Sequence, residues 1–157
     1  MTTTASPHAG SGVDRPVRGV DPRGPQLAAG ITAVVLVAVL LLPQPAATVL
    51  LAVQAVLFGI GAVRGVQATP HAWLFRTFVR PRLAPPAELE APEPPRFAQG
   101  VGLAFTLVGL VAFLAGAGLV AQVAVGAALV AALLNAVFAF CLGCEVYLLI
   151  RRVIATA

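Results

Sequence analysis

Two cysteines three residues apart, Cys141 and Cys144, are the residues of this chain best suited to chemistry, and the chain has no others. If the backbone around them is helical, residues at this spacing have Cα atoms about 5 Å apart, which a disulfide tolerates. The pair can therefore open and close without a large backbone movement. Because a reducing cytoplasm disfavours a static structural disulfide, the spacing favours catalytic or sensing dithiol chemistry.

The reactivity of the pair depends on which end of a helix carries it. If the chain breaks at Gly143, both thiols lie near the start of a new helix, whose dipole lowers a cysteine pKa from about 8.5. If the preceding helix instead continues to Arg151, the dipole and Glu145 both oppose ionisation. Inert packing, S-acylation and metal binding are the alternatives. A tetrahedral metal site needs four ligands, so no metal site is predicted.

Five further polar residues are secondary candidates for binding. They are His71, Arg76, Arg80, Asn135 and Glu145. Asn135 lies deep in an apolar stretch, where an amide can line a substrate path but more often hydrogen-bonds to a neighbouring helix. The chain has no nucleotide-binding loop, hydrolytic triad, metalloprotease motif or nucleic-acid module, and no nucleic-acid partner or cofactor is predicted.

The elements that carry these residues belong in a membrane. All sixteen charged side chains fall outside two blocks, Gly24–Val63 and Phe97–Cys144, and mean hydropathy is +0.95. Placing one Asp, Lys or Arg side chain at the centre of a bilayer costs about 2.5–3.5 kcal/mol of free energy. Each block is about twice the roughly 20 residues that a spanning helix needs, and each is interrupted near its middle. The sequence therefore predicts an all-α polytopic protein with four transmembrane helices, at about 27–42, 46–64, 97–115 and 119–140.

The distribution of arginine predicts the orientation. With four spans, all ten arginines lie on the same side as both termini, and the two hairpin turns carry no charge. By the positive-inside rule that side is the cytoplasm, so we expect a multi-pass protein of the cytoplasmic membrane with both termini inside.

The two halves of the chain resemble each other. Pro25–Gly30 opens the first span as Pro95–Gly100 opens the third, and His71–Arg76 follows the second span as Glu145–Ile150 follows the fourth. The offsets of about 70 and 74 residues predict two tandem helical hairpins in a parallel repeat.

Three segments are expected outside the spans. Residues 1–20 have the composition of a disordered tail, and residues 21–152 form the membrane domain. Residues 70–80 are predicted to form a short interfacial helix, with an apolar face beside Trp73 and with Arg76 and Arg80 on another face. Residues 81–95 contain six prolines and are predicted to form a stiff connector.

With these features in hand, the chain resembles the DUF4395 family, small integral membrane proteins known mainly from actinobacteria. The resemblance covers about residues 20–152. It rests on Val20-Asp21-Pro22-Arg23, Leu74-Phe75-Arg76, Val79-Arg80-Pro81-Arg82-Leu83, Pro95-Arg96-Phe97-Ala98-Gln99 and Phe140-Cys141-Leu142-Gly143-Cys144-Glu145 with Tyr147. The family has no established activity. Its members are often encoded near thioredoxin-like and sulfurtransferase-like proteins, and this implies a thiol or sulfur role for the cysteines.

The sequence favours a membrane thiol-redox or sulfur-relay protein, in which Cys141 or Cys144 attacks the disulfide of a cytosolic thioredoxin-like or sulfurtransferase-like partner and the other cysteine resolves the mixed disulfide. A quinone among the helices is a conceivable electron carrier that no residue demands. The alternatives are a non-enzymatic scaffold that docks a partner through Trp73–Arg82, and a small-solute transporter. Membrane lipid is an expected partner. Glycine-rich helix faces are compatible with close packing between copies of the chain, so a homo-oligomer is an alternative to a monomer.

Overall fold

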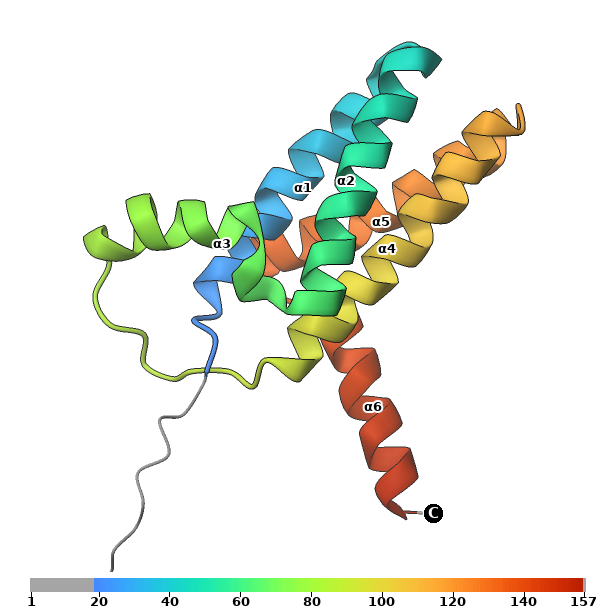
Figure 1. Cartoon of the computed structure of the whole chain (residues 1–157). Coiled ribbons are helices and arrows are strands. Elements are labelled where there is room, and N and C mark those ends of the chain that lie inside the picture. Colours follow the sequence, from blue (N-terminus) through green and yellow to red (C-terminus); the bar gives the residue numbers. More distant parts are fainter. Residues whose placement is uncertain (1–18, 157) are drawn as a thin grey trace, which may run out of the picture.

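A computed structural model describes residues 19–156, which form helices joined by short connections (Figure 1). The α-helices are α1 (Arg23–Leu41), α2 (Gln44–Arg64), α3 (Pro70–Leu74), α4 (Glu93–Leu114), α5 (Gly118–Phe138) and α6 (Leu142–Thr156). A 3₁₀ turn, Val66–Ala68, precedes α3, and a π-helical turn, Phe75–Val79, and a second 3₁₀ turn, Arg80–Arg82, extend it. Residues 1–18 of the predicted tail lie outside the described residues.

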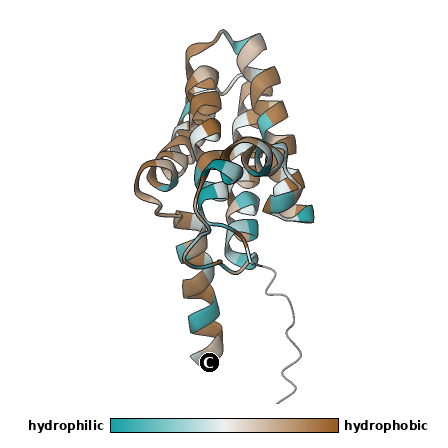
Figure 2. Cartoon of the chain, turned by 90° about the vertical axis from the view of Figure 1, so that its left-hand side faces the viewer, coloured by the Kyte–Doolittle hydropathy of each residue, from teal (hydrophilic) through white to brown (hydrophobic). Residues whose placement is uncertain are grey.

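Four of these helices, α1, α2, α4 and α5, are long and apolar enough to cross a membrane. Their outer surfaces carry large apolar side chains in the open: Leu41 is 80% exposed, Leu119 76% and Leu114 73%. Figure 2 shows these helices mostly brown, with more hydrophilic residues toward the end that carries α3 and the connector. An aqueous solvent would penalise so much exposed apolar surface, whereas lipid does not. The chain is therefore an all-α, multi-pass membrane protein.

The boundaries of the helices differ from the prediction mainly where prolines occur. The third span was predicted to begin at 97, but α4 begins at Glu93, with Pro94 and Pro95 in its first turn. Proline suits the first turn of a helix because the N–H that it lacks has no intrahelical partner there. The connector is correspondingly shorter than the predicted 81–95. The predicted helix at 70–80 is present as the continuous segment formed by α3 and the two turns that extend it.

The helix boundaries repeat with the two predicted offsets. Helix α4 begins 70 residues after α1, and both the first and the last residue of α5 follow those of α2 by 74. The contacts repeat as well, because α1 packs against α5 and α4 packs against α2. Exchanging the two halves converts one contact into the other. This symmetry supports the parallel repeat.

Equivalent side chains also join the halves at the ends of the helices. Gln26 Nε2, in α1, donates a hydrogen bond to Ala136 O in the last turn of α5, at 3.1 Å. Arg96, which follows Gln26 by 70 residues, donates to Ala62 O and Val63 O in the last turn of α2, at 2.7 and 2.8 Å. The last carbonyls of a helix lack intrahelical donors, so both contacts satisfy carbonyls that would otherwise need solvent.

The core lies between the two hairpins and consists of apolar side chains with small residues between them. Leu36, Leu51 and Val125 are fully buried there. A Cβ on Gly109 would lie 3.2 Å from both Leu51 and Val125, so this glycine allows α4 to approach its neighbours closely. In lipid, helix association depends on such close packing.

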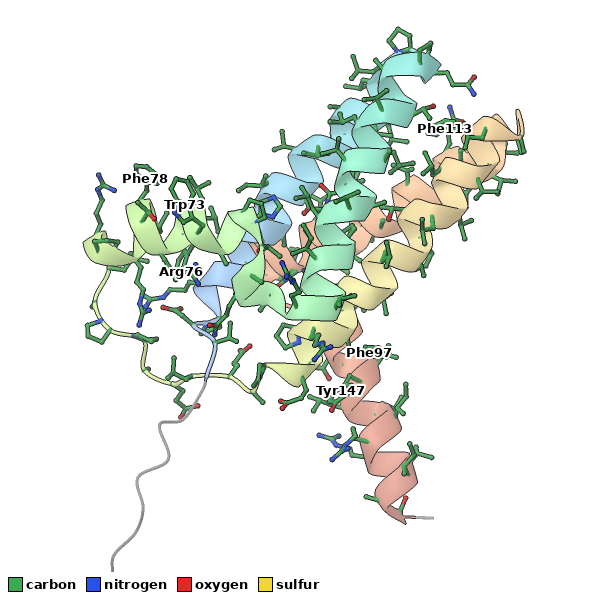
Figure 3. The ribbon with its side chains drawn as sticks, viewed as in Figure 1. Trp73, Arg76, Phe78, Phe97, Phe113 and Tyr147 are labelled. Carbon is green, nitrogen blue, oxygen red and sulfur yellow. A yellow bond between two sulfur atoms is a disulfide. The ribbon has the colours of Figure 1, made fainter. Side chains whose placement is uncertain are left out.

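The segment that contains α3 has two different faces. Trp73 and Phe78 contact each other edge to face, with ring centroids 5.9 Å apart, and both are exposed. In Figure 3 they lie on one side of the segment, whereas Arg76 lies on the other side, toward the start of α1. Phe75 is buried beside Gly24. The apolar side chains of this segment are therefore divided: Phe75 packs against α1, whereas Trp73 and Phe78 are exposed on the side opposite Arg76.

The connector is tied to the start of the described chain. Val20 and Glu90 exchange two backbone hydrogen bonds of 2.9 Å, and Arg23 donates to Ala84 O at 3.0 Å. Val20 is buried, so it belongs to the folded part of the chain.

Candidate functional site: the cysteine pair and the polar cavity

A break between α5 and α6 positions the cysteine pair. Helix α5 ends at Phe138, and Ala139 adopts a left-handed conformation with φ 54°. The Ala139 N–H still donates to Asn135 O at 3.1 Å, which closes the last turn before the chain turns away. A left-handed residue is a common helix stop, although glycine usually occupies it. The break therefore occurs four residues before Gly143, the position that the sequence suggested.

The two cysteines flank the beginning of α6 and are joined as a disulfide, with Cα atoms 5.2 Å apart. Cys141 directly precedes the helix, and Cys144 lies in its first turn. The Cys144 N–H donates to Cys141 Sγ at 3.3 Å, so the sulfur takes the place of an N-cap oxygen. Both residues are partly buried and lie outside the span α5. The predicted alternative in which α5 continues straight to Arg151 is wrong.

Helix α6 is held by a close contact with α4. Gly143 approaches α4 so closely that a Cβ on it would lie 2.6 Å from Ala98 Cβ. One turn further along α6, the ring of Tyr147 contacts that of Phe97, with centroids 5.6 Å apart (Figure 3). The glycine between the cysteines therefore serves packing, and it fixes the disulfide beside the first turns of α4.

The other binding candidates are dispersed, and Glu145 is the one that directly follows a cysteine in the chain. Glu145 follows Cys144 in the first turn of α6 and is exposed. Asn135 is partly buried one turn before the end of α5. His71, Arg76 and Arg80 lie together in the other half, where they line a cavity of about 290 Å³. Within residues 19–156, no group of three or more His, Cys, Asp or Glu side chains is placed to hold a metal ion.

The cavity extends from the α3 segment to the middle of the spans. Thr32 of α1 and Gln54 of α2 lie at its deep end, 5% and 1% exposed. At the other end, the pKa of Asp21 is lowered, chiefly by side-chain hydrogen bonds from Arg23, and burial lowers the pKa of His71. His71 is therefore neutral at neutral pH, and Asp21 is ionised and paired.

Sequence reasoning identified the cysteines but missed this cavity. Gln54 and Thr32 are isolated polar residues of two apolar spans, and neither is among the predicted site residues. Both residues lie near the middle of their spans, and the turn between α1 and α2 brings them together, with Gln54 Nε2 donating to Thr32 Oγ1 at 3.4 Å. Polar residues at matched depth in two antiparallel spans are the signal that would have found the deep end.

Comparison with curated proteins and with solved structures found no match. A family does match: residues 20–152, which include both cysteines and all of the cavity residues named above, fit the family described as "Domain of unknown function (DUF4395)". The chain belongs to the DUF4395 family.

Proposed function

We propose that this protein is a membrane thiol-redox protein that exchanges its Cys141–Cys144 disulfide with a cytosolic thiol protein. The observation that carries the proposal is the break before α6, which places Cys141 at the cap of the helix and Cys144 in its first turn. The free N–H groups of a first turn favour negative charge, so they stabilise a thiolate formed when the disulfide opens.

The exchange takes place in two steps. A thiolate of the partner attacks one sulfur of the pair, which breaks the Cys141–Cys144 bond and forms a mixed disulfide with the partner. The second thiolate of the partner then attacks the mixed disulfide and releases the pair. Two electrons and two protons move to Cys141 and Cys144, and the partner becomes a disulfide. In the reverse direction the Cys141 thiolate attacks, because the Cys144 N–H stabilises its charge, and Cys144 resolves.

The surroundings of the pair favour a protein partner over a small thiol. Phe140 and Leu142, on either side of Cys141, are 44% and 38% exposed. Two apolar side chains beside a partly buried sulfur offer a contact surface that a macromolecule can cover. The arginine distribution supports a cytoplasmic location for this surface, and a thioredoxin-like or sulfurtransferase-like protein has the required chemistry.

Thiol labelling in oriented vesicles tests the proposal. We expect a membrane-impermeant maleimide to label Cys141 and Cys144 in inside-out vesicles only after reduction, and to label neither in right-side-out vesicles. The reduced pair should react with a thioredoxin-type disulfide, and the Cys141→Ser variant should lose this exchange completely. The Cys144→Ser variant should instead trap a mixed disulfide through Cys141.

A matched topology control uses the hairpin turn at the other end of the bundle. In a chain with both cysteines replaced by serine, Ala117→Cys introduces one thiol at an exposed position between α4 and α5. This thiol should be labelled only in right-side-out vesicles. If reduced Cys141 and Cys144 resist labelling from both sides while Ala117→Cys reacts, the pair is a packing element and the proposal is wrong.

A further inference from the structure

The cavity in the first half of the molecule has the features of a ligand site. It is lined by α1, α2 and the α3 segment, with Gln99 from α4, and Gly19, Val20 and Leu89 contribute to its wall from outside the spans. The volume of about 290 Å³ lies at the lower end of the range for small-molecule pockets.

The deep end of the cavity contains a hydrogen-bond acceptor without a donor. Gln54 is 1% exposed, its Nε2 donates to Thr32 Oγ1, and its Oε1 has no hydrogen-bond partner among the described residues. A buried polar atom left without a partner costs about 1–3 kcal/mol. Since Gln54 lines the cavity, a ligand that brings a hydroxyl or N–H group to this atom removes that cost.

The opposite end of the cavity is electropositive. Arg76 and Arg80 line it, and neither forms a salt bridge with a described residue. The one carboxylate in the lining, Asp21, is already paired with Arg23 at 2.9 Å. Arg76 Nη1 donates to Gln67 O, which holds its side chain across the segment. The charge left at this end therefore favours an anion.

The remaining lining includes three large apolar side chains, Leu57 from α2, Phe75 from the π-helical turn and Leu89 from the connector. The neutral polar side chains beside them are Gln67, Thr69, His71 and Gln99. From these three features together we propose that the cavity binds a small organic anion with an apolar body: its acidic group lies at Arg76 and Arg80, and a hydrogen-bond donor at its far end reaches Gln54 Oε1. This site is separate from the cysteine pair and does not depend on thiol exchange.

A series of three related compounds tests the two polar contacts separately. The protein in nanodiscs of zwitterionic lipid is titrated with para-hydroxyphenylpropionate, with its para-methoxy analogue, and with its primary amide. Binding is measured by isothermal titration calorimetry, because Trp73, the only tryptophan of the chain, does not line the cavity. We expect the hydroxy acid to bind, and each single change to weaken binding about tenfold, which corresponds to one hydrogen bond or ion contact.

Variants then assign each loss to a residue. Gln54→Leu should abolish the preference for hydroxy over methoxy, and Arg80→Gln should reduce the preference for acid over amide. Gln122→Leu, at an exposed amide in α5, should leave both preferences unchanged. The comparison of ligands on the unaltered protein needs no variant to fold. Failure of the hydroxy acid to bind at millimolar concentration, or equal affinity for all three compounds, overturns the proposal, and neither result bears on the cysteine pair.

Discussion

In the first half of the molecule the middles of the two spans carry Thr32 and Gln54, whereas the same repeat positions in the second half, displaced by 70 and 74 residues, carry Gly102 and Ala128. The consequences for packing are opposite. A Cβ at Gly102 would lie 2.7 Å from the ring of Phe58, and Ala128 belongs to the hydrophobic core, so this part of the second half is filled. The first half holds a cavity at the corresponding depth.

The helices that follow the two hairpins, α3 and α6, also begin in similar ways but with different capping side chains. Thr69 Oγ1 accepts a hydrogen bond of 3.3 Å from Ala72 N at the start of α3, and Cys141 Sγ accepts one of 3.3 Å from Cys144 N at the start of α6. A hydroxyl in this place only caps a helix, whereas a thiol can also react. Both halves thus have a side-chain cap at the start of the helix that follows the hairpin, although Thr69 and Cys141 are 72 residues apart and do not match at the 74-residue offset of α2 and α5. The polar cavity lies in one half and the sulfur pair in the other.

The largest effect is expected from placing the amide of the first half into the second. Ala128→Gln puts a long polar side chain into the core among Leu36, Leu51 and Val125, where it meets no cavity. Overpacking and an unsatisfied buried amide together should lower the free energy of unfolding by about 2–5 kcal/mol. The converse change, Gln54→Leu, should alter it by no more than about 1 kcal/mol. Thermal unfolding in detergent, followed by circular dichroism, measures both.

A size control separates the two causes. Ala128→Leu adds bulk without an amide, so it should cost less than Ala128→Gln, by the desolvation penalty alone. If Ala128→Gln proves as stable as the native chain, the second half has space for an amide, and the contrast between the halves is not real.

A smaller effect is expected at the glycine between the cysteines. Gly143→Ala places a Cβ 2.6 Å from Ala98 Cβ, so α6 has to move away from α4 and the contact between Phe97 and Tyr147 should weaken. We expect a loss of about 1–3 kcal/mol and faster maleimide labelling of the reduced cysteines. Gly100→Ala is the matched control, because no atom lies within 4 Å of a Cβ there. Labelling at the native rate in Gly143→Ala would show that this contact does not position the pair.

The spans and the repeat could be predicted from the sequence because they depend on the average composition of long segments and not on single residues. The absence of charge over Gly24–Val63 and Phe97–Cys144 predicts the spans, and similar short segments at two offsets predict the repeat, which the boundaries of α2 and α5 confirm. Apolar composition over about 20 residues is a strong signal, since each inserted charge is costly.

The details of the site depend on single residues and on contacts between distant segments. The sequence left two alternatives open, a break at Gly143 or a straight helix to Arg151. The chain instead turns at Ala139, whose side chain gives no signal for a left-handed residue. Gly143 is instead required by its contact with Ala98, which is distant in the chain. The cavity likewise depends on which way Gln54 faces, and helix packing, not local sequence, decides this.

The smallest expected effect compares the two side chains that cap the spans. Arg96 donates two hydrogen bonds to Ala62 O and Val63 O, and its repeat equivalent Gln26 donates one, to Ala136 O. Hydrogen bonds from a charged donor are stronger, although exposure of Arg96 reduces their contribution, so Arg96→Met should lower the free energy of unfolding by about 1–2 kcal/mol and Gln26→Met by about 0.5–1 kcal/mol. The two contacts join different helix pairs, so the double variant should show the sum of the two losses in the same thermal unfolding assay. A double variant that loses much less than this sum would mean that the two hairpins separate once either capping contact is lost. The two contacts would then stabilise one cooperative unit and would not act independently.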